Sequence, residues 1–199
     1  MAQRILVILG QPSSQSLSAA MAQAYSEGAR AAGAQVRFLA LGELDFDPIL
    51  HHGYRQIQPL EPDLEAAQAD IAWARHLVWV YPIWWGGLPA LLKGFLDRVF
   101  LPGFAFKYRT NSALWDKLLS GRSAELLVTM DSPPWYYRWV QRQPGHRQMK
   151  KTILEFSGIR PVQVHSFGPV VRSSDAARAG WIARARALGA RAGGQSARA

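Results

Sequence analysis

Hydrophobic residues along the chain gather in short continuous runs, and these runs alternate with longer stretches of helical spacing. A continuous apolar run of strand length is typical of a strand buried on both faces of a parallel sheet. Helical spacing is clearest from Leu88 onward, where apolar residues recur every three or four positions. We therefore expect strands at Arg4–Leu9, Gln35–Leu41, His76–Tyr81, Ser123–Thr129 and Pro161–Phe167, and helices at about Ser16–Ala32, Asp63–Ala74, Leu88–Phe100, Gln148–Ser157 and Ser174–Leu188.

The order of these elements predicts a doubly wound α/β fold. Five strands that alternate with helices indicate right-handed crossovers, and hence a parallel sheet with helices on both faces. In the strand order 2-1-3-4-5, ligands bind beyond the carboxyl ends of strands 1 and 3, where the order reverses. The loops at that point are residues 10–18 and residues 81–87, so we expect the ligand site there.

The length of 199 residues suits one domain with a single well-filled core. We expect this domain to cover residues 1–189 and residues 190–199 to form a disordered basic tail. No apolar stretch reaches the roughly 18 residues that a membrane-spanning helix needs, and the apolar run at Arg4–Leu9 is too short for a secretory signal. These features predict a cytoplasmic protein.

The composition excludes several kinds of chemistry. The chain has no cysteine, which rules out disulfides, thiolate nucleophiles and zinc–sulfur sites, and we expect no metal site. The net charge of +9 suggests an anionic partner, but many arginines lie on the last predicted helix and the tail, where they can simply solvate a helix face. Because no nucleic-acid-binding motif accompanies the charge, we do not expect a nucleic-acid partner.

The first loop of the predicted site is rich in serine and reads GQPSSQSLSAA. It has no G-x-G-x-x-G, and no G-x-x-x-x-G-K-[ST] occurs in the chain, so a Rossmann dinucleotide site and a P-loop are both disfavoured. Hydroxyls and free amides at a helix N-terminus suit a phosphate group, and helix capping alone would also explain the serines. The four serines concerned are Ser13, Ser14, Ser16 and Ser18.

The second and third loops carry unusual aromatic bulk. The second places two tryptophans between Pro82 and two glycines, and the third, Thr129–Val140, reads TMDSPPWYYRWV. Such tryptophans can belong to the core, but beside a phosphate-type loop they favour a planar ligand that carries phosphate. We therefore predict a flavin site, with phosphate at the first loop and the isoalloxazine ring between the second and third loops.

The segment from Tyr81 onward, YPIWWGGLPALLKGFLDRVFLPGFAFKY, resembles the signature of the flavodoxin-like NAD(P)H:quinone oxidoreductases. That family includes mammalian quinone reductases and bacterial ancillary proteins of potassium efflux systems. A weaker resemblance extends through LDFDPIL at Leu44–Leu50 and LEFSGI at Leu154–Ile159. The resemblance implies a flavodoxin-like fold with bound FAD, or with FMN, and NADPH or NADH as the electron donor.

The resemblance also implies which residues form the site. The expected flavin contacts are Gln11, Ser16, Leu17, Ser18, Gln68, Pro82, Ile83, Trp84, Trp85, Gly86, Thr129, Met130 and Asp131. The expected substrate contacts are Trp85, Phe106, Tyr108 and Phe156, together with Tyr137 of the aromatic third loop, and no catalytic residue is assigned.

The chain departs from the mammalian pattern at several of these positions. Gln11 stands in place of a histidine and Ser18 in place of an asparagine, while Met130–Asp131 replaces a Gly-Gly turn. The mammalian tyrosine and histidine beyond that turn have no counterpart at matching spacing. We therefore do not transfer their role to Tyr137 or His146, and we expect His146 at the surface.

The implied reaction is a hydride transfer from NAD(P)H through flavin N5 to a quinone-like acceptor, by a ping-pong mechanism. In the resembling enzymes the segment with Phe106 and Tyr108 reaches across a two-fold axis, so we expect a homodimer with shared active sites. A one-electron flavodoxin carrier is an alternative, although such carriers are typically acidic. Azo- or nitroreductase activity and a regulatory subunit of a potassium efflux system also stay open.

Overall fold

The computed structural model describes residues 2–195, and its centre is a five-stranded parallel sheet. The strand order β2-β1-β3-β6-β7 is the predicted 2-1-3-4-5 order, so the flavodoxin-like doubly wound fold is confirmed. The strands are β1 (Arg4–Leu9), β2 (Gln35–Ala40), β3 (His76–Pro82), β6 (Ser123–Thr129) and β7 (Val162–Phe167).

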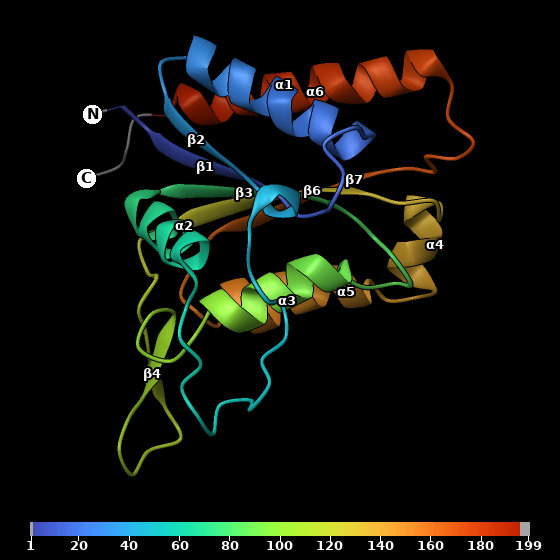
Figure 1. Cartoon of the computed structure of the whole chain (residues 1–199). Coiled ribbons are helices and arrows are strands. Elements are labelled where there is room, and N and C mark those ends of the chain that lie inside the picture. The colour runs from blue at the N-terminus through green and yellow to red at the C-terminus, as the bar shows by residue number, and fades with distance from the viewer. Residues whose placement is uncertain (1, 196–199) are drawn as a thin grey trace.

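Helices cover both faces of the sheet (Figure 1). One face carries α1 (Leu17–Ala31) and α6 (Asp175–Gly193), which lie side by side. The other face carries α2 (Pro62–Trp73), α3 (Ala90–Val99), α5 (Pro144–Arg147) and a π-helix (Gln148–Leu154) that continues α5. Among residues 2–195, no helix is both long enough and apolar enough to cross a membrane.

The apolar strand runs fill two cores because successive side chains point to opposite faces of the sheet. Ile5 and Val7 face α1 and α6, whereas Leu6 and Ile8 face α2 and α3. The second core is the larger and is centred on Trp79, which is fully buried. This double burial explains why the strands appear in the sequence as unbroken hydrophobic runs.

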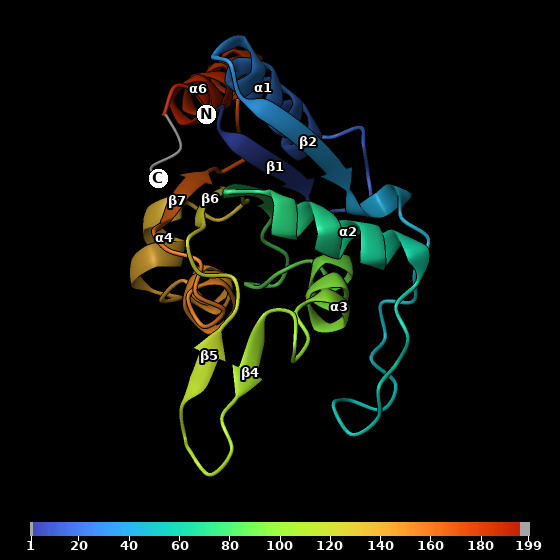
Figure 2. The same ribbon diagram turned by 90° about the vertical axis from the view of Figure 1, so that its left-hand side faces the viewer.

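Three elements differ from the sequence-based expectation. A hairpin of β4 (Phe106–Tyr108) and β5 (Trp115–Lys117) follows α3, and a short helix, α4 (Pro134–Trp139), lies within the expected third loop. Figure 2 shows the hairpin projecting away from the sheet. The last helix continues to Gly193, so residues 190–193 are helical rather than part of a tail; residues 196–199 of the expected tail lie outside the described residues.

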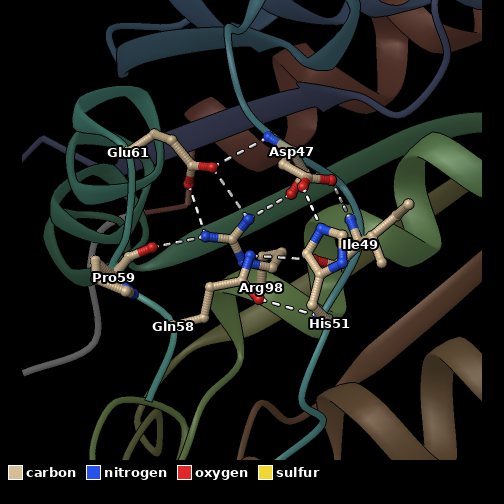
Figure 3. Close-up of polar contacts among 7 residues, drawn as sticks. All are labelled: Asp47, Ile49, His51, Gln58, Pro59, Glu61 and Arg98. Atoms are coloured by element: carbon tan, nitrogen blue, oxygen red, sulfur yellow. Dashed lines mark hydrogen bonds and ion pairs between the residues drawn. The ribbon is translucent and has the colours of Figure 1, made fainter. Parts of the chain in front are cut away.

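The long connection between β2 and α2, which includes a 3₁₀ turn at Leu41–Glu43, is fastened to α3 by Arg98 (Figure 3). The Arg98 side chain is buried and donates to the backbone oxygen of Asp47, to that of Pro59 at 2.8 Å, and to Glu61 Oε2 at 2.7 Å. Burial alone would raise the pKa of Glu61, but the Arg98 hydrogen bonds hold it below its usual value. One cation thus joins both ends of the loop to the helix.

Candidate functional site

The candidate site lies at the carboxyl ends of β1, β3 and β6, where three loops begin side by side. Gly10 N donates to Val80 O at 2.8 Å, and Ile83 N donates to Thr129 O at 2.8 Å. β1 lies between β2 and β3, so the chain leaves it and returns to it on opposite sides. This is the reversal of strand order at which doubly wound sheets bind ligands.

The first loop presents the N-terminus of α1. Ser16 caps the helix, and the buried Gln11 side chain orders the loop by donating to Ser13 O at 2.7 Å and to Ser16 Oγ. The amides of Leu17 and Ser18 have no acceptor among residues 2–195. Free amides at the positive end of a fifteen-residue helix can hold a phosphate group.

The Ser18 hydroxyl is not available to such a group, contrary to expectation. Its Oγ lies 3.0 Å from Thr129 Oγ1, and both side chains are buried. The pair instead ties the start of α1 to the end of β6. At this position only the backbone amide can face a ligand.

The tryptophans form the tip of a tight reverse turn. Trp84 N donates to Gly87 O at 3.2 Å and Gly87 N to Trp84 O at 3.0 Å, while Trp85 and Gly86 have φ of 51° and 77°. Two positive φ values at the central positions are typical of a type I′ turn. Trp85 is fully exposed and Trp84 about half exposed, so the core explanation for the pair is wrong.

Tyr137, which lies in α4, holds this turn in place through hydrogen bonds. Its hydroxyl donates to Gly86 O and accepts from Gly145 N, both at 2.9 Å. We expect from the sequence that Tyr137 contacts the substrate, but the residue is only 1% exposed. In this structure it positions the turn and does not line an open substrate pocket. The hydroxyl could not be assigned from sequence because Gly86 is 51 positions away.

The start of the third loop is turned inward. The Met130 side chain is buried, its amide donates to Phe167 O, and its oxygen accepts from Val170 N. Asp131 Oδ1 accepts from Val171 N at 3.0 Å, which directs this carboxylate toward the loop after β7. Met130 therefore offers no free backbone polar group to a ring above the turn, which differs from the expected Met130 contact. Asp131 is exposed, and its backbone amide has no acceptor among residues 2–195.

The expected acceptor residues form an aromatic cluster at the hairpin. Phe106 is 9% exposed and packs edge-on against Tyr108 and Phe156, with ring centroids 5.2 and 5.1 Å apart. Tyr108 is 63% exposed. Trp115, which sequence reasoning missed because a three-residue strand gives no periodic signal, stacks on Phe156 at 4.4 Å. Phe106, Tyr108 and Phe156 border a cleft of about 390 Å³ that Tyr54 of the long loop also lines.

Gln68 and His146 lie in positions that differ from the sequence-based expectation. Gln68 donates to Val99 O at 2.9 Å, at the end of α3 opposite the tryptophan turn, so one protomer does not bring it to the other expected flavin contacts. His146 is buried rather than on the surface: it is 4% exposed, with Nε2 2.9 Å from Ser166 Oγ. Burial lowers the pKa of His146 to about 4, so it is neutral at neutral pH.

The fold and these loops agree with the relationships of the chain. A family model described as a flavodoxin-like fold matches residues 3–189. The chain belongs to this flavodoxin-like family.

Within the flavodoxin-like family, the chain is similar to proteins with oxidoreductase names. It is 31% identical over 183 residues to an uncharacterized NAD(P)H oxidoreductase of Haemophilus influenzae, with 89% of each chain covered. It is 30% identical over 135 residues to NAD(P)H dehydrogenase [quinone] 1 of Cavia porcellus, covering 57% of this chain and 48% of that protein. The solved structure of an NAD(P)H:quinone oxidoreductase from Methanothermobacter marburgensis aligns with a TM-score of 0.81 at 25% identity, over 96% of this chain and 98% of that one.

The residues of this flavodoxin-like site fit a flavin. The amides of Leu17 and Ser18 could hold its phosphate, and the apolar Trp84–Gly87 turn could lie against its ring. At the tip of the turn, the amides of Trp85 and Gly86 have no acceptor within residues 2–195. The Asp131 carboxylate, which would repel a reduced ring, is held by Val171.

Proposed function

We propose that this chain is a flavin-dependent NAD(P)H:quinone oxidoreductase, which moves two electrons as a hydride from NAD(P)H to a quinone-like acceptor. The observation that carries the proposal is the exposed tryptophan turn at the switch point of the sheet, beside a capped helix with free amides. The oxidoreductase names of the relatives support the same activity.

A bound flavin would supply the hydride chemistry, and the protein would supply binding and electrostatics. The N-terminus of α1 would hold the phosphate. The free amides of Trp85 and Gly86 would hold the ring and stabilise the negative charge that grows on reduction. The two indoles would form an apolar wall that orients the acceptor and excludes water.

We expect the flavin to be FAD rather than FMN. A hollow of about 340 Å³ adjoins the first loop, between the start of α1 and the end of β2, and is lined by Ser14, Ser16 and Phe38 among others. It offers room beyond the phosphate site for the adenosine half of FAD. FMN would leave this hollow open.

The proposed enzyme is a cytoplasmic homodimer in which Tyr108 and Phe106 complete the partner's acceptor site. Support comes from large apolar side chains that are exposed on the long loop and the hairpin: Ile49, Tyr54, Ile57, Tyr108, Leu114 and Leu118. Both segments hang from the same side of the molecule (Figure 2). Exposed apolar patches of this kind usually mark interfaces.

The test is to purify the protein, record its absorbance between about 350 and 500 nm, where oxidised flavins absorb, and identify the released cofactor by chromatography. We expect a flavin spectrum, and NAD(P)H oxidation that depends on added quinone. A colourless protein that neither flavin reconstitutes would overturn the proposal. Bound flavin without quinone turnover, but with turnover of azo or nitro compounds, would reassign the acceptor.

A further inference from the structure

A cleft of about 720 Å³ lies apart from the candidate flavin site, between α4, α5, the π-helix and the edge strand β7. Its walls include Trp135 and Trp139 from α4, and its β7 side is Val164 and Ser166. His146 also lines it and, being neutral, adds no charge.

The side chains that line the cleft carry several positive charges. Arg138, Arg147, Lys150 and Lys151 all line it, and no aspartate or glutamate does. Arg138 and Arg147 make no side-chain hydrogen bond or ion pair to any residue between 2 and 195. Among residues 2–195, Lys150 donates only to Val162 O at 2.9 Å, whereas Lys151 is paired with Glu155 at 2.9 Å. Within these residues, the charges of Arg138, Arg147 and Lys150 therefore lack a neighbouring carboxylate.

The same cleft offers flat aromatic surface. Trp135 and Trp139 are both well exposed, and the Arg138 guanidinium lies 4.9 Å from the Trp139 ring centroid. Indole and guanidinium planes stack on nucleobases, and arginine binds phosphate in a bidentate manner. The combination suits a ligand that is both planar and phosphorylated, which is the chemistry of a nucleotide.

The cleft is one layer of residues away from the tryptophan turn. The His146 ring in its wall packs edge-on against Tyr137 with centroids 5.0 Å apart, and Tyr137 holds Gly86 O. The neighbouring Gly145 N also donates to Gly86 O, at 3.2 Å. A dinucleotide with its nicotinamide at the turn can therefore place its adenosine end near the cleft.

We propose that this cleft binds the 2′-phosphorylated adenosine of NADPH and thereby selects NADPH over NADH. This proposal rests on the proposed function only in assuming that the nicotinamide of the donor lies at the tryptophan turn. The 2′-phosphate is the difference between the two donors, and it adds a charge of roughly −1.5 to −2 where Arg138 and Arg147 are free. Phosphate bound there would satisfy both guanidinium groups.

Equilibrium binding tests the cleft without any turnover. By calorimetry, adenosine 2′,5′-bisphosphate should bind about a hundredfold more tightly than adenosine 5′-monophosphate, because charge-assisted contacts to both guanidinium groups are gained. Arg147→Gln should remove about a factor of ten of this gain for the bisphosphate and leave the monophosphate unchanged. The matched control is Arg30→Gln, in the last turn of α1 at the opposite end of the sheet, which should bind both as the parent protein does.

Kinetics then separate the two proposals. Arg147→Gln should lower kcat/KM for NADPH by about tenfold and leave the value for NADH unchanged. Equal affinity for the two adenosine phosphates, or inorganic phosphate binding as tightly as the bisphosphate, would overturn the cleft assignment. Bisphosphate binding in a protein that oxidises neither donor would overturn the proposed function and keep the cleft.

Discussion

Trp85 occupies a backbone conformation that side chains other than glycine adopt at a cost. Its φ of 51° lies in the left-handed region, which costs about 1 kcal/mol or more for an L-residue. Its indole is fully exposed and so contributes little to the core. A strained backbone conformation at a residue whose side chain adds no core packing is typical of turns that bind ligands. Activity at the proposed quinone site should therefore depend on the residues that hold this turn in place.

Tyr137→Phe tests that dependence. The change removes the hydroxyl that joins Gly86 O to Gly145 N, and it should lower stability by about 1–2 kcal/mol. We expect quinone kcat/KM to fall by about tenfold with flavin content retained, because the turn loses its fixed position. Tyr136→Phe is the matched control, since Tyr136 is partly exposed and its hydroxyl makes no hydrogen bond within residues 2–195. Equal turnover in the two variants would contradict the supporting role.

Histidines in the interior should make the fold sensitive to acid. His76 is buried between Tyr25 OH at 3.2 Å and Ser123 Oγ at 2.8 Å, and burial lowers its pKa to about 4. Because the unfolded chain binds this proton near pH 6.5 and the folded chain does not, stability should fall as the pH drops from about 6.5 toward 4. The slope is about 1.4 kcal/mol per pH unit for each such histidine.

Urea unfolding at several pH values measures this slope. His76→Gln should lower stability at neutral pH and flatten the slope between about pH 6.5 and 4 by one proton. His146→Gln should flatten it in the same way, because burial lowers the pKa of His146 to about 4 as well. A slope that neither substitution changes would show that other groups govern the acid response.

At the scale of elements, the long loop after β2 depends on a close approach to α3. A side chain at Gly94 would meet Pro48, with its β-carbon 2.5 Å from Pro48 Cβ and 2.6 Å from Pro48 O. Only glycine lets the loop backbone lie this close to the helix, and Arg98 one turn later completes the attachment. The attachment also places Tyr54 at the wall of the hairpin cleft.

Gly94→Ala should therefore be destabilising even though alanine favours helices. We expect a loss of about 1–3 kcal/mol from the steric conflict with Pro48. Gly180→Ala is the matched control, because Gly180 lies in α6 with open space around it, and alanine there should stabilise by about 0.5–1 kcal/mol. Thermal unfolding of both variants checks the opposite signs, and a stabilising Gly94→Ala would contradict the described contact.

The sequence predicted the elements whose signal is local and continuous. The five sheet strands and α1, α2 and α3 were found within a few residues, because buried strands are apolar runs and amphipathic helices repeat every three to four positions. The β4–β5 hairpin was missed because its strands are three residues long and are held by the Trp115–Phe156 stack. α4 was missed because Pro133 and Pro134 suggested a loop, although proline is well suited to a first helical turn.

The candidate site was predictable in its place and only partly in its contacts. Topology alone brings the serine loop and the tryptophan turn together at the carboxyl ends of the strands. The pairing of Ser18 with Thr129 and the folding of Gln11 into its own loop depend on side-chain orientation that no pattern encodes. The basic cleft combines residues of α4, α5 and β7, which become neighbours only in the folded chain.

At the scale of the whole molecule, shared active sites in a homodimer would couple two copies of the chain. Tyr108 is a better probe of the shared site than Phe106, because Phe106 is buried against Phe156 of the same chain whereas Tyr108 is exposed. Tyr108→Ala mixed with Trp85→Ala should recover up to about a quarter of parental quinone turnover, since half the dimers would contain one intact site. Neither variant alone should reach this level. A monomer by light scattering with full turnover would contradict the shared sites.

Arg98 binds Asp47 O on one side of the loop tip, and Pro59 O and Glu61 on the other side. Both sides of the loop therefore stay attached to α3 even if the backbone between them is cut. The exposed Arg55 between them is a suitable site for trypsin. Limited digestion should cut there and yield two fragments on a denaturing gel, yet the nicked chain should elute in gel filtration as one particle of the original size. Arg55→Gln should resist this cut. The two fragments would then stay together as one folded particle, joined in part by the contacts of one buried arginine.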